Sequence, residues 1–177
     1  MAVADGDITV KQIGHSSRYK IEVLKDGITA NLRDVGIGIS QVLPVLILAY
    51  FAPEGSVIML EEPEIHLHPL AQSVLAELFA ETSKERNIQF IVETHSEHIF
   101  RRMQTLIAQQ TLVSDVNTEP DVLMYFIERT GSQANLRQLT VDEYGRVKNW
   151  PENFFGDSLG ESRRQAELMI KRLKEQQ

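Results

Sequence analysis

The sequence predicts an α/β fold, in which a mostly parallel sheet is flanked by helices and carries an added β-hairpin and a C-terminal helix. Two short apolar runs, Val57–Leu60 and Ile88–Val92, indicate neighbouring parallel strands, because each is brief and ends abruptly in polar residues. Between them, apolar side chains recur at helical spacing after Pro69, which can begin a helix without losing a hydrogen bond. We expect the first strand to be buried on both faces, as in other parallel sheets.

The N-terminal residues 1–33 predict β structure at a sheet edge. Two segments there alternate apolar and polar side chains, a turn signal follows, and a further short strand comes after it. In chain order these are Ile8–Val10, Tyr19–Leu24, Lys25–Gly27 and Ile28–Leu32.

A glycine-rich segment then leads into an apolar helix that we expect to run from Val42 to Phe51. Gly36 and Gly38 permit close approach of the backbone and unusual dihedral angles. Ser40 would open the helix, whose free amides and dipole favour an anion. The segment is therefore a candidate anion site.

The C-terminal part of the chain predicts a helix, a hairpin and a last helix. The first helix would cover residues 97–110, and strand candidates at 122–128 and 134–141 would pair across a turn. Aromatic residues crowd together in 150–157, where they either close the core or form a binding surface. The last helix, 161–176, has one apolar face and would dock on the core or on a partner.

Bulk composition limits the classes of protein. A chain of 177 residues with 42% hydrophobic residues is expected to form one domain with a sizeable core. The net charge of -7 argues against a broad nucleic-acid surface. There are no cysteines, no apolar run approaches the ~20 residues of a membrane span, and no signal peptide is evident. We expect a cytoplasmic protein without membrane contact.

Chemically capable residues follow both predicted strands. Glu61 and Glu62 come at the end of the first strand, and Thr94, His95 and Ser96 come after the second. Open α/β sheets place their ligands at the carboxyl ends of their strands, so these side chains should meet at one edge. Two acids and a histidine there predict a hydrolytic site that handles a metal-bound phosphate.

This arrangement resembles the ABC-type ATPase superfamily, in its chromosome-maintenance and DNA-repair branch, and especially the overcoming-lysogenization-defect-like and RecF-like AAA-family ATPases. Val57–Glu62 looks like the Walker B motif, Pro63–Pro69 like the D-loop region and His95 like the switch histidine. The resemblance implies that Glu61 holds Mg²⁺, usually through water, and that Glu62 polarises the attacking water. Aspartate is the commoner first acid in ABC proteins, and Glu61 departs from it.

The segment Asp34–Gln41 resembles a degenerate ABC signature. In ABC proteins this element binds the γ-phosphate of ATP held by the other subunit. The resemblance therefore implies a second ATPase head, as in a homodimer, and four candidate nucleotide-binding residues: Gly36, Gly38, Ser40 and Gln41.

No Gly-x-x-x-x-Gly-Lys-Ser/Thr motif occurs in the sequence, and the expected Q-loop is also absent. We therefore expect residues 1–140 to be the C-terminal lobe of an ATPase head and 141–177 to be a small extension that resembles a domain of unknown function. The chain would be a truncated form, a fragment or a split subunit, inactive alone and completed by an N-terminal P-loop lobe. DNA or a nuclease is the expected client, in DNA repair, genome maintenance or phage defence.

Two alternatives stay open at this point. The first is a metal-dependent hydrolase, because histidines near carboxylates can hold zinc or manganese. Its candidate ligands are His66, His68, His95 and His98. The second is a non-catalytic half-domain that binds a partner carrying the P-loop.

Overall fold

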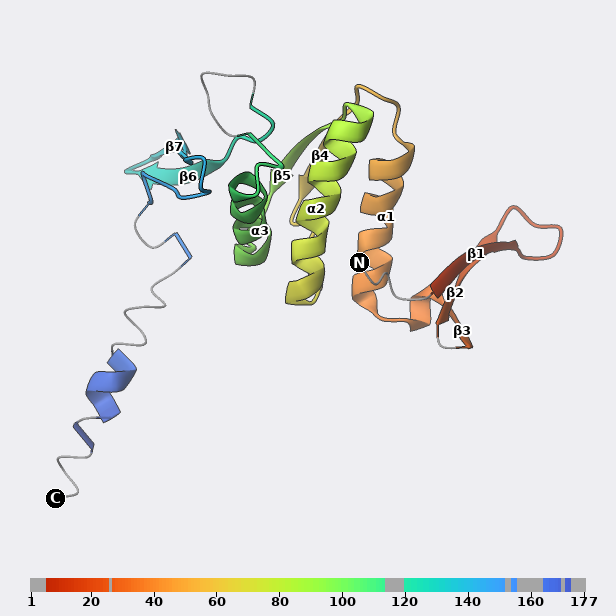
Figure 1. Cartoon of the computed structure of the whole chain (residues 1–177). Helices are drawn as coiled ribbons and strands as arrows, with labels where there is room; N and C mark the ends of the chain where they lie inside the picture. The colour runs from red at the N-terminus through yellow and green to blue at the C-terminus, as the bar shows by residue number, and fades with distance from the viewer. Residues whose placement is uncertain are drawn as a thin grey trace. The chain divides into compact units, whose positions relative to one another are not determined.

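A computed structural model describes residues 6–25, 27–113, 120–151, 154–155, 164–169 and 171–172. The chain divides into two compact units, Met1–Met103 and Gln104–Gln177. Each unit is described by itself below. The elements confirm the predicted α/β class (Figure 1).

The first unit begins with a three-stranded antiparallel sheet, β1-β2-β3. Its strands are Gly6–Gln12, Tyr19–Lys25 and Ile28–Asn31. β2 is the central strand and carries Glu22. The Oε2 atom of Glu22 lies 2.5 Å from Nζ of Lys11, and its Oε1 atom lies 2.6 Å from Nζ of Lys20. Hydrogen bonds from these two ammonium groups, that of Lys11 first, lower the pKa of Glu22. The predicted β structure is confirmed, but in the described residues it forms its own sheet instead of the edge of the parallel one.

Helix α1 spans Ile37–Phe51, after a short 3₁₀ turn at Leu32–Asp34. It starts five residues before the predicted Val42, so Ser40 lies within its first turns and does not open it. The helix starts there because Gly36 takes a φ of 95°, which turns the chain into the helix and which other residues rarely adopt. Pro44 lies inside the helix, where it removes one backbone hydrogen bond.

A parallel pair of strands with an intervening helix follows. β4 is Val57–Glu61, α2 is Pro69–Arg86 and β5 is Gln89–Glu93. The two strands pair in parallel, with Ile58 opposite Phe90 and Glu61 opposite Glu93. The predicted strand–helix–strand order is confirmed, and both strands end at the same edge.

The ends of α2 are satisfied locally. The Nδ1 atom of His68 accepts a hydrogen bond from the Leu70 N–H at 3.3 Å and caps the first turn. Asn87 ends the helix with a φ of 51°. Arg86, in the last turn, donates to the carbonyl oxygens of Ala49 at 2.8 Å and Ala52 at 2.6 Å, and so ties α2 to the end of α1.

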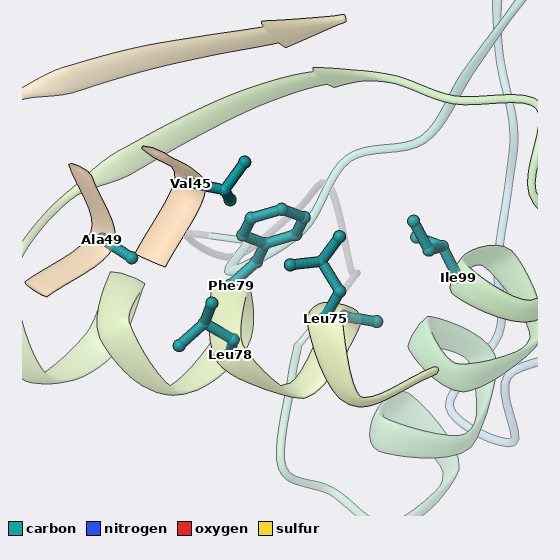
Figure 2. Close-up of a cluster of buried hydrophobic side chains, with 7 residues drawn as sticks. Val45, Ala49, Leu75, Leu78, Phe79 and Ile99 are labelled. Carbon is teal, nitrogen blue, oxygen red and sulfur yellow. The ribbon is translucent and has the colours of Figure 1, made fainter. Parts of the chain in front are cut away.

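The core of the first unit lies between α1, α2 and the strands (Figure 2). The ring centroids of Phe79 on α2 and Phe90 on β5 are 4.9 Å apart. Figure 2 shows Val45 and Ala49 of α1 beside Phe79, in a cluster whose buried members come from α1, α2 and α3 (Glu97–Ala108). They are Val45, Ala49, Leu75, Ala76, Leu78, Phe79 and Ile99.

The opposite face of the β4–β5 pair is uncovered in the described part of the chain. Val57 is 57% exposed, Met59 75% and Ile91 48%, whereas Ile58 between them is buried. The prediction of a strand buried on both faces is therefore wrong for this chain. An apolar strand indicates that other residues pack on both of its faces. It does not indicate whether those residues belong to the same chain.

The second unit contains the predicted hairpin. β6 is Tyr125–Thr130 and β7 is Gln133–Gln138, antiparallel with Ile127 opposite Leu136. Phe154 packs against Phe126 of β6 with centroids 5.2 Å apart, and against Trp150 at 5.1 Å. Residues 164–169 and 171–172 are helical, and the rest of the predicted 161–176 helix lies outside the described residues.

A tight turn in this unit is organised by Asp142. Its Oδ1 accepts hydrogen bonds from the backbone N–H groups of Tyr144 at 3.0 Å and Arg146 at 2.9 Å, and its Oδ2 accepts from Arg146 Nε at 3.0 Å. These contacts lower the pKa of Asp142 below 3.8, and the hydrogen bond from the Arg146 amide is the largest cause. The adjoining Gly145 is required, because a Cβ there would lie 2.2 Å from the Gln104 carbonyl oxygen.

We expect Asp142→Asn to lower the free energy of unfolding at neutral pH. The folded state depresses this pKa, so the carboxylate stabilises the fold above the unfolded value of about 3.8, and this contribution disappears as the pH falls through the folded pKa. Urea unfolding of the second unit can be followed by the fluorescence of Trp150, the single tryptophan. The gap between wild type and variant should close in acid. A constant gap would contradict the charge argument, and Glu143→Gln is the neighbouring control.

Candidate active site

The carboxyl ends of β4 and β5 form a shallow pocket. It is lined by Glu61, Glu62, Glu93 and Ile65. The Glu62 N–H donates to the Glu93 carbonyl oxygen at 2.9 Å, which extends the strand pairing by one residue and fixes the two ends together. The sequence prediction that both polar segments meet at one edge is therefore confirmed by the fold.

Glu62 and His95 face each other across this edge. The Nε2 atom of His95 lies 3.3 Å from Oε1 of Glu62. The side chain of His95 is 77% exposed and that of Glu62 is 43% exposed, so both remain open to a ligand. In such a pair the carboxylate can accept a proton from a bound water. The imidazole can donate a hydrogen bond to a group that gains negative charge in the reaction.

The backbone is strained where Glu62 leaves the strand. Glu62 has a φ of 43° and His66 a φ of 63°, in the left-handed region that favours glycine. Two successive turns hold this loop, because the N–H groups of Ile65 and Leu67 donate to the carbonyl oxygens of Glu62 and Glu64 at 3.1 and 3.0 Å. Strain of this kind concentrates at functional sites, and here it belongs to a proposed catalytic residue.

Two acids at this edge were not predicted from the sequence. Glu93 lines the pocket and is paired with Glu61. Its signal was available, because it directly follows the second apolar run, Ile88–Val92. Glu64 is 6% exposed, and its Oε1 accepts hydrogen bonds from Thr94 Oγ1 and the His95 N–H. No local pattern distinguishes Glu64, because its partners lie about thirty residues away in the sequence.

The four signature-like residues lie at the beginning of α1. Gly36 precedes the helix, and Gly38, Ser40 and Gln41 lie within it. The Ser40 hydroxyl donates to the Ile37 carbonyl oxygen of its own helix at 2.8 Å. Gly36 provides no side-chain cap, and the first amides of a helix are groups that can bind an anion. Their role in binding nucleotide stays a prediction.

Gly38 brings α1 against the loop that follows β4. A Cβ at this position would lie 2.9 Å from the His66 carbonyl oxygen and 3.4 Å from Leu67 Cδ2. The first contact is with backbone, which cannot move aside as a flexible side chain can. Gly38 therefore allows the close approach predicted from the sequence, although the partner shown is the protein's own loop.

We expect Gly38→Ala to destabilise the protein by about 1 kcal/mol. Alanine inside a helix normally gains about 1 kcal/mol over glycine, but overpacking costs roughly 1–3 kcal/mol and here outweighs that gain. Chemical denaturation measures the difference, with Ser40→Ala in the same helix as a control. A stabilised Gly38→Ala protein would mean that the loop relaxes freely.

The donor set at the edge suits magnesium better than zinc. Mg²⁺ prefers oxygen ligands and is usually bound by one or two carboxylates together with water and substrate phosphates. Glu61 and Glu62 provide such oxygens beside an open pocket. Among the residues that the structure describes, no three His, Asp or Glu side chains are grouped to hold a metal ion by themselves. His68 caps α2 through its Nδ1 atom. The described residues therefore contain no histidine cluster of the kind that the zinc or manganese hydrolase would need.

Comparison with known proteins assigns most of the chain to two families. Residues 4–100, more than half of the chain, match the family model described as AAA ATPase domain. The chain belongs to the AAA ATPase domain family. Residues 118–165 match a second family, described as a protein of unknown function (DUF3696). No curated protein matches the sequence significantly.

A solved structure gives independent support for the fold of this AAA ATPase-domain chain. It is described as "Structural biochemistry of ATP-driven dimerization and DNA stimulated activation of SMC ATPases". The similarity has a TM-score of 0.54 at 16% sequence identity, and it covers 75% of this chain and 74% of the other. At this identity the likeness concerns the fold alone. No helix in the described ranges is both long and apolar enough to cross a bilayer.

Proposed function

We propose that this chain supplies the Walker B and switch half of a magnesium-dependent ATPase head, which hydrolyses ATP to ADP and phosphate. The observation that carries this proposal is the 3.3 Å approach of His95 to Glu62 at the edge where Glu61 also ends its strand. Membership of the AAA ATPase domain family supports nucleotide as the ligand.

In the proposed reaction Glu62 orients the attacking water and accepts its proton as the oxygen bonds to the γ-phosphorus. The electron pair of the broken P–O bond leaves with ADP. His95 contacts the γ-phosphate and stabilises its charge. Glu61 would hold Mg²⁺, which when bound would neutralise charge on the phosphates.

The uncovered apolar surfaces of the first unit support a partner lobe. Within the described residues one face of β4–β5 is uncovered, and α1 exposes further large apolar side chains, among them Leu48, Tyr50 and Phe51. Exposed patches of this kind mark interaction sites in stable proteins. We propose that a P-loop-bearing lobe covers the strand face, because the sequence contains no phosphate-cradling motif of its own.

The amides at the start of α1 would then meet ATP held by a second head, with Gly36, Gly38, Ser40 and Gln41 at the contact. ATP-driven dimerization is described for the SMC ATPases of similar fold, and this supports a dimer of heads. By resemblance we further propose a cytoplasmic role in DNA repair, genome maintenance or phage defence, with DNA or a nuclease as the client.

The test is magnesium-dependent ATP hydrolysis by the purified chain, alone and after assembly with a P-loop lobe of the same family. We expect no turnover from the chain alone, turnover after assembly, and loss of that turnover in His95→Ala. Hydrolysis by the chain alone that disappears in Glu62→Gln would overturn the half-site assignment. An assembled complex that binds ATP without hydrolysing it would overturn the catalytic assignment.

A further inference from the structure

The buried carboxylate of Glu64 connects the loop after β4 to the loop after β5. One oxygen, Oε1, lies 2.5 Å from the Thr94 hydroxyl and 3.1 Å from the His95 amide nitrogen, and both groups donate to it. The other oxygen, Oε2, is buried and accepts no hydrogen bond from any residue described. Through Oε1 alone, the Glu64 side chain is therefore hydrogen-bonded to the segment that carries His95.

A second connection holds the far side of the same segment. The Ser96 hydroxyl donates to Gln72 Oε1 at 2.5 Å, and Gln72 Nε2 donates to the Leu67 carbonyl oxygen at 2.9 Å. Thr94 Oγ1 also accepts from the Ser96 N–H at 3.0 Å. Residues 94–96 are thus tied at both ends to the 62–68 loop and to α2.

The imidazole of His95 is held differently. Its side chain is 77% exposed, and its Nε2 atom lies 3.3 Å from Oε1 of Glu62. The backbone of His95 fixes the point from which the ring reaches Glu62, and that backbone donates its N–H to Glu64. Moving Glu64 would displace His95 relative to Glu62.

We propose that Glu64 is a positioning residue, whose buried carboxylate fixes the backbone of His95 so that the imidazole stands beside Glu62. This inference rests on the proposed function, because it gives Glu64 a role through His95 and none in direct contact with ATP. It also explains why a side chain whose oxygen accepts two hydrogen bonds is buried in this loop.

The first test uses amide hydrogen exchange of the 177-residue chain, measured by NMR. Glu64→Ala should accelerate exchange of the His95 amide roughly 10- to 100-fold, because the amide loses its hydrogen-bond acceptor. Glu64→Gln keeps the accepting oxygen and should retain most of the protection. The Gln89 amide, which donates to the Ser56 carbonyl oxygen at 2.9 Å, is the control. Equal His95 exchange in wild type and Glu64→Ala would overturn the proposal.

The second test uses the assembled ATPase. Glu64→Ala should lower kcat by about 10²-fold with little change in KM, as small misplacements of catalytic groups do, and Glu64→Gln should restore most of the rate. If Glu64 acts through His95, the double variant Glu64→Ala/His95→Ala will be no slower than His95→Ala. Losses that multiply in the double variant would overturn the positioning role.

The two hypotheses fail in different ways. If His95→Ala turns over like wild type, the assignment of His95 in the proposed function is wrong. If His95→Ala is slow and Glu64→Ala is as fast as wild type, only the inference about Glu64 is wrong. Should Glu64→Ala not fold, Thr94→Val removes one of the two donors and Thr94→Ser retains it. We then expect slower turnover in the valine variant alone, and equal rates would contradict the proposal.

Discussion

Replacing Glu62 by glutamine is expected to reduce ATP turnover by the assembled enzyme by about 10²- to 10⁴-fold, the usual contribution of a general base. Glutamine keeps the size of the side chain and an oxygen for hydrogen bonding, but it cannot accept a proton from water at neutral pH. ATP binding should persist, because Glu62 lies at the edge of the pocket and is proposed to act on the water. ATP should therefore trap the variant as a dimer of heads.

The measurement is steady-state hydrolysis together with nucleotide binding and the oligomeric state in ATP. Glu93→Gln is the matched control, since Glu93 lines the same pocket and the described residues place His95 beside Glu62 instead. We expect less than a tenfold loss for that control, an order of magnitude below the effect of a general base. Wild-type turnover in Glu62→Gln would remove Glu62 from the mechanism, and equal losses in both variants would leave the base unassigned between them.

The edge that holds these acids is predictable because its signals are local. A short apolar run followed at once by acids identifies both a strand and the end at which its ligands bind, and Glu61 and Glu62 follow from the first run alone. The pairing of β4 with β5 then places His95 near Glu62. The closeness of Glu62 and His95 follows from the order of residues along two neighbouring strands.

Other features depend on contacts that local patterns do not contain. Glycine is a poor helix former, so the sequence predicts that α1 starts after Gly38. In the structure Gly38 lies inside the helix, where the close contact with His66 leaves no room for a Cβ. Glu64 is buried between two left-handed residues, Glu62 and His66, and its hydrogen-bond partner Thr94 is thirty residues away in the sequence. The open face of β4 shows a third limit, since an apolar strand indicates cover without identifying its source.

The core beneath this edge provides the prediction with the largest effect on stability. Phe79 is 3% exposed and lies against Phe90, in the cluster that joins α1, α2 and the strands. Phe79→Ala should lower the free energy of unfolding by about 3–5 kcal/mol, because it removes a buried ring and leaves a cavity. Since domains are stable by only about 5–15 kcal/mol in total, much of the first unit's stability would be lost.

Urea unfolding followed by far-ultraviolet circular dichroism measures this loss, and Leu70→Ala is the matched control on the same helix. Leu70 is 67% exposed, so its truncation should change stability by no more than about 0.5 kcal/mol. Phe79→Leu keeps much of the buried volume and should fall between the two. A Phe79→Ala protein within about 1 kcal/mol of wild type would contradict the packing of α2 on α1 and β5. Because that packing holds the strands whose ends carry Glu62 and His95, weakening it should also loosen the edge at which these two side chains meet.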